Sequence, residues 1–144
     1  LTKADVQATT GGVTGNNLNY TVVFNNISVD RSGGQNVANG VWTCPVTGDY
    51  RMATQVTVDT VVASMTTGTV EIITNGADGS EGATFNPYSD LSGSGLSRAN
   101  VDSIFRMLAG QTAFVRLNIA GGPGNTARVV GGGKQTRLLI EAVG

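Results

Sequence analysis

Apolar and polar residues alternate with a period of two along much of the chain. The longest example starts at Tyr50, where the apolar face continues to Val58 and the intervening positions are mostly polar. A period of two is typical of a strand with one buried and one solvated face. The predicted inner positions are Tyr50, Met52, Thr54, Val56 and Val58, and the predicted outer positions are Arg51, Ala53, Gln55, Thr57 and Asp59.

Two later segments, 101–108 and 112–119, show the same alternation and are separated by Ala109-Gly110-Gln111. Because a short Gly-containing turn joins two amphipathic strands, we predict that they form a β-hairpin. The predicted inner positions are Val101, Ser103, Phe105, Met107, Ala113, Val115, Leu117 and Ile119.

Shorter strands are predicted at 20–24, 27–30, 69–74 and 136–142, with Gly- and Asn-rich turns between them. The last of these is apolar on both faces, since Leu138 and Ile140 alternate with Leu139. We therefore expect one face to meet the core and the other to meet a neighbouring subunit or covering loops.

The segment 75–100 breaks this spacing because it contains five Gly, one Pro and few apolar residues. We predict a long displayed surface loop here, with room for one short strand at 83–85. The whole chain, 1–144, is predicted to form a single domain that includes this loop, and 1–18 is predicted to be an N-terminal arm or a first strand.

Composition supports an all-β fold, because 42 of the 144 residues are Thr, Val or Ile and 21 are Gly. Charged residues make up 13%, well below the roughly 25% of ordinary soluble domains. The nine basic residues are scattered and the net charge is −1, so no phosphate-binding stripe exists and no nucleic-acid partner is expected. No apolar run approaches the roughly 20 residues of a spanning helix, so membrane insertion is not expected either.

The chain has no His, which excludes Ser-His-Asp and Cys-His catalytic arrangements and favours a non-enzymatic protein. Cys44 has no activating neighbour, so we predict a buried structural thiol that shares one strand face with Trp42. The start at Leu1 rather than Met suggests an upstream stalk or leader.

The 75–100 segment holds the best candidates for binding chemistry. Oxygen-bearing side chains at Asp78, Ser80, Glu81 and Asp90 are of the type that calcium prefers, but their spacing does not match an EF-hand. A solvated loop is favoured over a metal site, and no cofactor is expected. We predict that this loop contacts a ligand through Asp78, Glu81, Tyr88 and Asp90, because it is the one long segment that no strand requires.

Residues 23–52 resemble the central signature of complement C1q-like domains. An apolar-aromatic strand ends near an Asn, a turn-rich gap follows, and then come an aromatic residue, Thr, Cys, Pro, Val, Gly and Tyr. The matching positions are Phe24, Asn25, Gly40, Trp42, Thr43, Cys44, Pro45, Val46, Gly48 and Tyr50. Phe24, Trp42, Cys44, Pro45, Gly48 and Tyr50 are the core motif of this resemblance.

The resemblance to the C1q/TNF-like superfamily implies a jelly-roll β-sandwich of two antiparallel sheets with about ten strands, assembled as a homotrimer. The superfamily includes virion proteins of bacteriophages, and the low charge and polar surface favour such a member: a fibre head, knob or capsid decoration on the virion surface. Its partners would be other virion proteins and a host-surface glycan or protein. The alternatives are a secreted C1q-like or cytokine-like extracellular recognition head and a shell-forming jelly-roll coat subunit.

Overall fold

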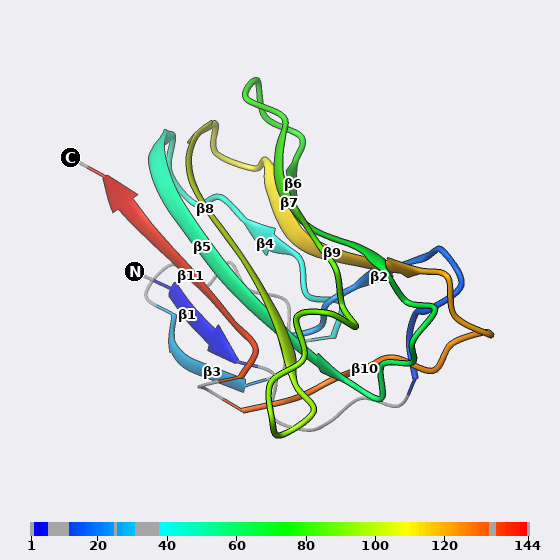
Figure 1. Ribbon diagram of the computed structural model, residues 1–144. Helices are drawn as coiled ribbons and strands as arrows, with labels where there is room; N and C mark the ends of the chain where they lie inside the picture. The colour runs from blue at the N-terminus through cyan, green and yellow to red at the C-terminus, as the bar shows by residue number, and fades with distance from the viewer. Residues whose placement is uncertain (1, 6–11, 25, 31–37, 133–134, 144) are drawn as a thin grey trace.

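Two antiparallel β-sheets packed face to face form the protein (Figure 1). The computed structural model describes residues 2–5, 12–24, 26–30, 38–132 and 135–143. In 2–5 and 26–30 it describes the backbone alone. Within these ranges there are eleven strands and no helix, and hence no helix able to span a membrane. The strands are β1 (Thr2–Asp5), β2 (Leu18–Thr21), β3 (Asn26–Asp30), β4 (Trp42–Thr43), β5 (Gly48–Asp59), β6 (Thr67–Thr74), β7 (Ser80–Phe85), β8 (Ser97–Met107), β9 (Thr112–Ala120), β10 (Arg128–Val129) and β11 (Arg137–Val143).

The first sheet, here called the β5 sheet, is organised around the longest strand. β8 pairs with β5 along its whole length, while β11 and β10 pair with its other edge. β11 continues the sheet to β1 and then to β3. The strands that are adjacent here are far apart in the chain, since Tyr50 lies opposite both Phe105 and Ala142.

The second sheet, the β9 sheet, has the order β2-β9-β6-β7, with β4 paired to β9 beyond β2. Residues at every second position of β9 and β6 point inward, such as Leu117 opposite Val70. The hydrophobic core lies between the two sheets. The alternation read from the sequence therefore places the correct face of β5, β8 and β9 inward, except that Thr57, predicted to face outward, is fully buried. The predicted all-β fold of two antiparallel sheets is confirmed.

The predicted hairpin of 101–108 with 112–119 is wrong. β8 pairs with β5, whereas β9 pairs with β6, β2 and β4 in the other sheet. The turn at Ala109-Gly110-Gln111 therefore carries the chain across the sandwich, and Gly110 takes the left-handed φ of 90° that this corner uses. Each strand buries an apolar face, and facing sheets satisfy that requirement as well as a hairpin does.

The segment 75–100 is not one loop. Residues 75–79 form the tip of a β6–β7 hairpin, β7 occupies 80–85, and β8 already begins at Ser97. A loop remains at 86–96. The sequence pattern does not reveal the full length of β7. It is an edge strand in which only Ala83 and Phe85 are partly buried, so it needs little apolar alternation.

At the N-terminus, residues 2–5 form the first strand and Leu18 begins β2. Residues 6–11 of the predicted arm lie outside the described residues, as does Asn25 of the C1q-like signature.

The core motif lies at one edge of the core, where β4 turns into β5. Phe24, Trp42, Cys44 and Tyr50 are buried, and the Trp42 and Tyr50 rings meet edge to face with centroids 5.1 Å apart. Pro45 is exposed and Gly48 is half-buried, so these two shape the turn and do not fill the core.

Candidate functional site

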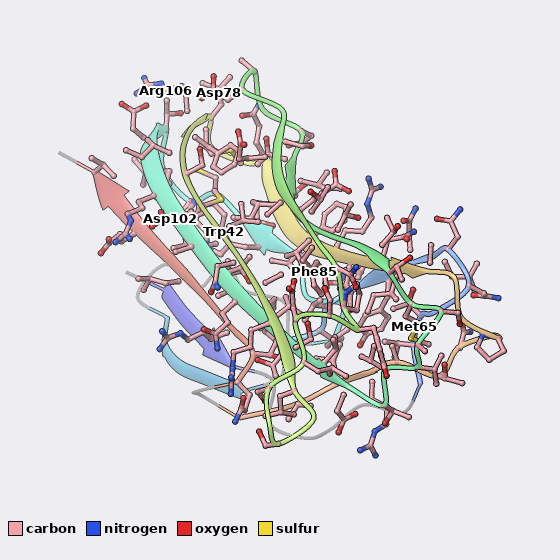
Figure 2. All side chains as sticks on the ribbon, viewed as in Figure 1. Trp42, Met65, Asp78, Phe85, Asp102 and Arg106 are labelled. Carbon is pink, nitrogen blue, oxygen red and sulfur yellow. The ribbon has the colours of Figure 1, made fainter. Side chains whose placement is uncertain are left out.

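The two ends of the sandwich are built differently. One, the turn end, consists of the tight connections 44–47, 75–79 and 108–111. The other, the loop end, consists of 12–17, 60–66, 86–96 and 121–127. Figure 2 shows the contrast, with Asp78 and Arg106 together at the turn end and Met65 at the loop end.

The four residues predicted as ligand contacts are not brought together. Asp78 lies at the turn end and Glu81 on edge strand β7, while Tyr88 and Asp90 lie at the loop end. Within the described ranges, no three Asp, Glu or Cys side chains are grouped so that they could hold a metal ion. The calcium hypothesis for Asp78, Ser80, Glu81 and Asp90 therefore has no geometric support.

Asp78 has a structural contact of its own. Its Oδ2 accepts a hydrogen bond of 2.6 Å from the backbone N–H of Arg106. The contact ties the β6–β7 hairpin tip to the end of β8, so the carboxylate is already engaged by the protein.

Side chains of the core motif hydrogen-bond to the backbone of the turn end. The Tyr50 hydroxyl donates to the Val46 carbonyl at 2.6 Å, and the Cys44 thiol donates to the same oxygen at 3.1 Å. Burial, and then the neighbouring Cys44 thiol, raise the pKa of Tyr50 above its usual value. The motif thus fixes a turn and does not form a reactive site.

A second candidate site is the outer face of the β5 sheet, where side chains of opposite charge meet across strands. Arg51 on β5 donates to both carboxylate oxygens of Asp102 on β8, at 3.0 and 2.6 Å. The same guanidinium reaches Glu141 on β11 at 3.2 Å, so it bridges three strands. A second pair joins Arg106 to Asp49 at 3.3 Å.

These contacts shift the ionisation of the groups involved. Hydrogen bonds from Arg51 lower the pKa of Asp102, and hydrogen bonds to Asp102 and Glu141 raise the pKa of Arg51. Arg51 and Asp102 therefore favour their charged forms and form an ion pair within a single protomer.

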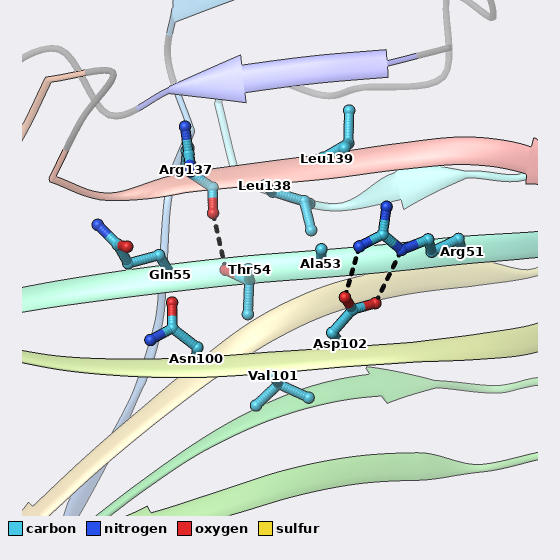
Figure 3. Close-up of a pocket in the computed structure, with 10 residues that line it drawn as sticks. All are labelled: Arg51, Ala53, Thr54, Gln55, Asn100, Val101, Asp102, Arg137, Leu138 and Leu139. Atoms are coloured by element: carbon cyan, nitrogen blue, oxygen red, sulfur yellow. Dashed lines mark hydrogen bonds and ion pairs between the residues drawn. The ribbon is translucent and has the colours of Figure 1, made fainter.

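Apolar side chains lie on this same face. Ile104 on β8 is 57% exposed and Val143 at the end of β11 is 44% exposed, while Leu108, 53% exposed, follows β8 directly in the turn at 108–111. Between β8 and β11 there is a hollow of about 380 Å³ (Figure 3). It is lined by Arg51, Ala53, Thr54, Gln55, Asn100, Val101, Asp102, Arg137, Leu138 and Leu139.

This combination suits association with another surface more than chemistry. Charges that are compensated before binding cost less to remove from water than unpaired ones, and the exposed apolar side chains gain from burial. In the sequence, Ile104 and Leu108 are the apolar residues on the alternating face that also carries Asp102 and Arg106. The cross-strand ion pairs were not visible, because they depend on which distant strands lie side by side.

Comparison with known proteins shows the fold but no close relative. No protein-family model matches the chain, and no curated protein sequence matches it. Among solved structures, the globular domain of zebrafish complement 1qA is similar at 13% identity and a TM-score of 0.66, covering 99% of this chain and 96% of that one. Murine APRIL at pH 8.0 is similar at 12% identity and a TM-score of 0.67, covering 99% and 97%. The chain therefore has the jelly-roll fold of C1q and TNF-family globular domains.

Proposed function

We propose that this protein is a non-enzymatic homotrimeric head displayed on the surface of a phage or viral particle, where it attaches to a host or stabilises the particle. The observation that carries the assembly part is the outer face of the β5 sheet. Its exposed apolar side chains, together with the Arg51 and Arg106 charges that are already paired within the protomer, suit it to burial against a neighbour.

A closed threefold arrangement would cover this face on every copy. It would also supply the neighbouring subunit that the doubly apolar β11 requires, since Leu139 lines the hollow on the outer side while Leu138 and Ile140 fill the core. In a closed ring every copy of such a face is covered, whereas an open chain of subunits would leave one face exposed at its end.

The particle location rests on the sequence: a polar, weakly charged surface rich in Gly, Thr and Asn, and one buried Cys with no disulfide partner. A secreted recognition head has the same fold and is supported equally by the likeness to complement 1qA and APRIL. A shell-forming coat subunit would instead need contacts that continue beyond a trimer.

Two measurements test the proposal. Light scattering coupled to size exclusion should give three times the mass of one chain across a dilution series; a monomer, or a polydisperse large assembly, would contradict it. Antibodies to the purified domain should decorate intact particles in electron micrographs of lysates from the source. Staining of secreted material without particles would instead favour the extracellular head.

A further inference from the structure

We infer that the loop end binds an uncharged carbohydrate, with Tyr88 as the aromatic platform for a sugar ring. The inference rests on the proposed attachment function and names the ligand class and the residue that would serve it.

The loops of this end form a fixed framework around one buried side chain. Met65 is fully buried, and a methyl group added at Gly15 would lie 2.9 Å from its Cε, so the loops from three parts of the chain close tightly over it. The Gly122 N–H donates to the Gly15 carbonyl at 2.6 Å, and the Asn17 N–H donates to the Ile119 carbonyl at 2.9 Å. Such a framework can present a side chain without first having to order a loop.

Tyr88 is presented on this framework with its backbone fixed. Its N–H donates to the Met65 carbonyl at 3.1 Å, and the Leu91 N–H donates to its carbonyl at 3.3 Å. Asn86 and Asp90 close the same turn, since the Asn86 N–H donates to Asp90 Oδ2 at 3.2 Å and the Asp90 N–H donates to the Asn86 carbonyl at 3.0 Å. The residue nevertheless remains 46% exposed, so its backbone is held while much of the aromatic side chain faces water.

The charges at this end favour a neutral ligand. The segments 12–17, 60–66, 86–96 and 121–127 contain no Lys or Arg. Their single acidic residue, Asp90, is engaged by the Asn86 N–H. Just beyond the loops, Arg128 forms an ion pair with Asp59 at 2.7 Å, and Arg98 donates to the neutral side-chain amide of Gln135 at 2.8 Å. Sialylated or sulfated sugars favour a cationic partner, and the four described loop segments contain none.

The remaining surface is suited to hydroxyl-rich molecules. Ser92 and Ser94 expose hydroxyls 2.9 Å apart, beside Gly93 and Gly95. Tyr, Ser, Gly and Asn are the side chains that give binding loops a rigid aromatic contact together with adaptable hydrogen bonding. A sugar ring matches both, because its C–H face packs on an aromatic ring while its hydroxyls exchange hydrogen bonds. The loop end has neither Trp nor Arg, which with Tyr are the usual anchors of protein–protein contacts.

The loop end lies at the opposite end of the sandwich from the start of β1 and the end of β11. β11 runs toward the turn end, with Val143 opposite Asp49, and β1 runs the opposite way beside it. The start of β1 at Thr2 and the end of β11 at Val143 therefore both point away from the loop end (Figure 1). Attachment to a particle through either terminus would leave Tyr88 facing the surroundings.

The test is binding of the purified full chain to immobilised oligosaccharides: neutral ones ending in glucose, galactose, mannose or N-acetylglucosamine, and matched sialylated and sulfated ones. At least one neutral sugar should bind, with little change between low and high salt. Tyr88→Ala should weaken that binding about tenfold, and Tyr88→Phe should retain it because the ring remains. Val46→Ala, at the turn end and 66% exposed, is the matched control and should bind like the unmodified protein.

The inference is overturned if no neutral sugar binds, if only charged sugars bind, or if Tyr88→Ala binds as well as the unmodified protein. Should Tyr88→Ala lose thermal stability, Tyr88→Leu keeps apolar bulk without the ring and must still show the loss. Light scattering on the same samples separates this inference from the proposed assembly. A trimer that binds no sugar overturns the inference alone, whereas a monomer with Tyr88-dependent binding overturns the trimer alone.

Discussion

Replacing Ile104 by Thr tests the proposed assembly face most directly. Ile104 is 57% exposed in the protomer, so more than half of its apolar surface is still available for burial by a neighbour. Full burial of such a side chain contributes about 1.5–3 kcal/mol, so covering the exposed part should contribute about 1–1.5 kcal/mol per protomer. Over three copies the loss is at most about 3–4.5 kcal/mol, and about 3 kcal/mol shifts trimer dissociation by about 100-fold.

The choice of Thr keeps the experiment interpretable. Thr is β-branched and suits a strand, and being uncharged it adds no charge beside Arg51, which lies opposite position 104 on β5. Because the side chain is exposed, the protomer itself should change in stability by less than about 0.5 kcal/mol.

The assay is light scattering over a dilution series, together with thermal unfolding of the protomer. Leu18→Thr is the matched control, since Leu18 is 48% exposed but lies on β2 in the other sheet. The variant at 104 should dissociate at concentrations where the unmodified protein and the control remain trimeric. Equal dissociation of both variants, or an unchanged trimer in Ile104→Thr, would refute the assignment of this face.

Three further predictions concern the scaffold. Cys44, only 1% exposed, should react with thiol reagents far more slowly in the native protein than in denaturant; equal rates would mean that the turn end opens. Gly121→Ala should destabilise by roughly 3 kcal/mol in chemical denaturation, because position 121 has a φ of 97° and an added methyl group would overlap the Ser64 carbonyl oxygen. Gly124→Ala, with a φ of 94° and open space, should cost only about 1 kcal/mol, and equal losses would contradict the overlap. Asp59, whose pKa is lowered by hydrogen bonds from Arg128, should stabilise the fold above about pH 4 and lose that effect as the pH falls below it. Asp59→Asn should therefore cost about 0.5 kcal/mol at pH 7 and little at pH 2.5, and a pH-independent difference would argue against the ion pair.

Local pattern determined much of this protein. The period of two places Met52, Phe105 and Leu117 inward, because side chains on a strand alternate between its faces whatever the strand pairs with. The same logic exposes Ile104 on a polar face. The all-β class follows from composition for a similar reason, since the preference of Val, Ile and Thr for strands is a property of each residue.

The tertiary structure alone decided what depends on distant neighbours. Alternation is the same whether β8 turns back on β9 or crosses to the opposite sheet, so the hairpin prediction had no means of choosing between them. The Arg51–Asp102–Glu141 bridge exists because β5, β8 and β11 are neighbours in the sheet, although Arg51 and Glu141 are 90 residues apart in the sequence. The predicted ligand contacts separated for the same reason, as β7 carries the chain from Asp78 at one end of the sandwich to Tyr88 at the other. A sequence encodes which face of each strand is buried, whereas the partners of that strand are set by the packing of the whole chain.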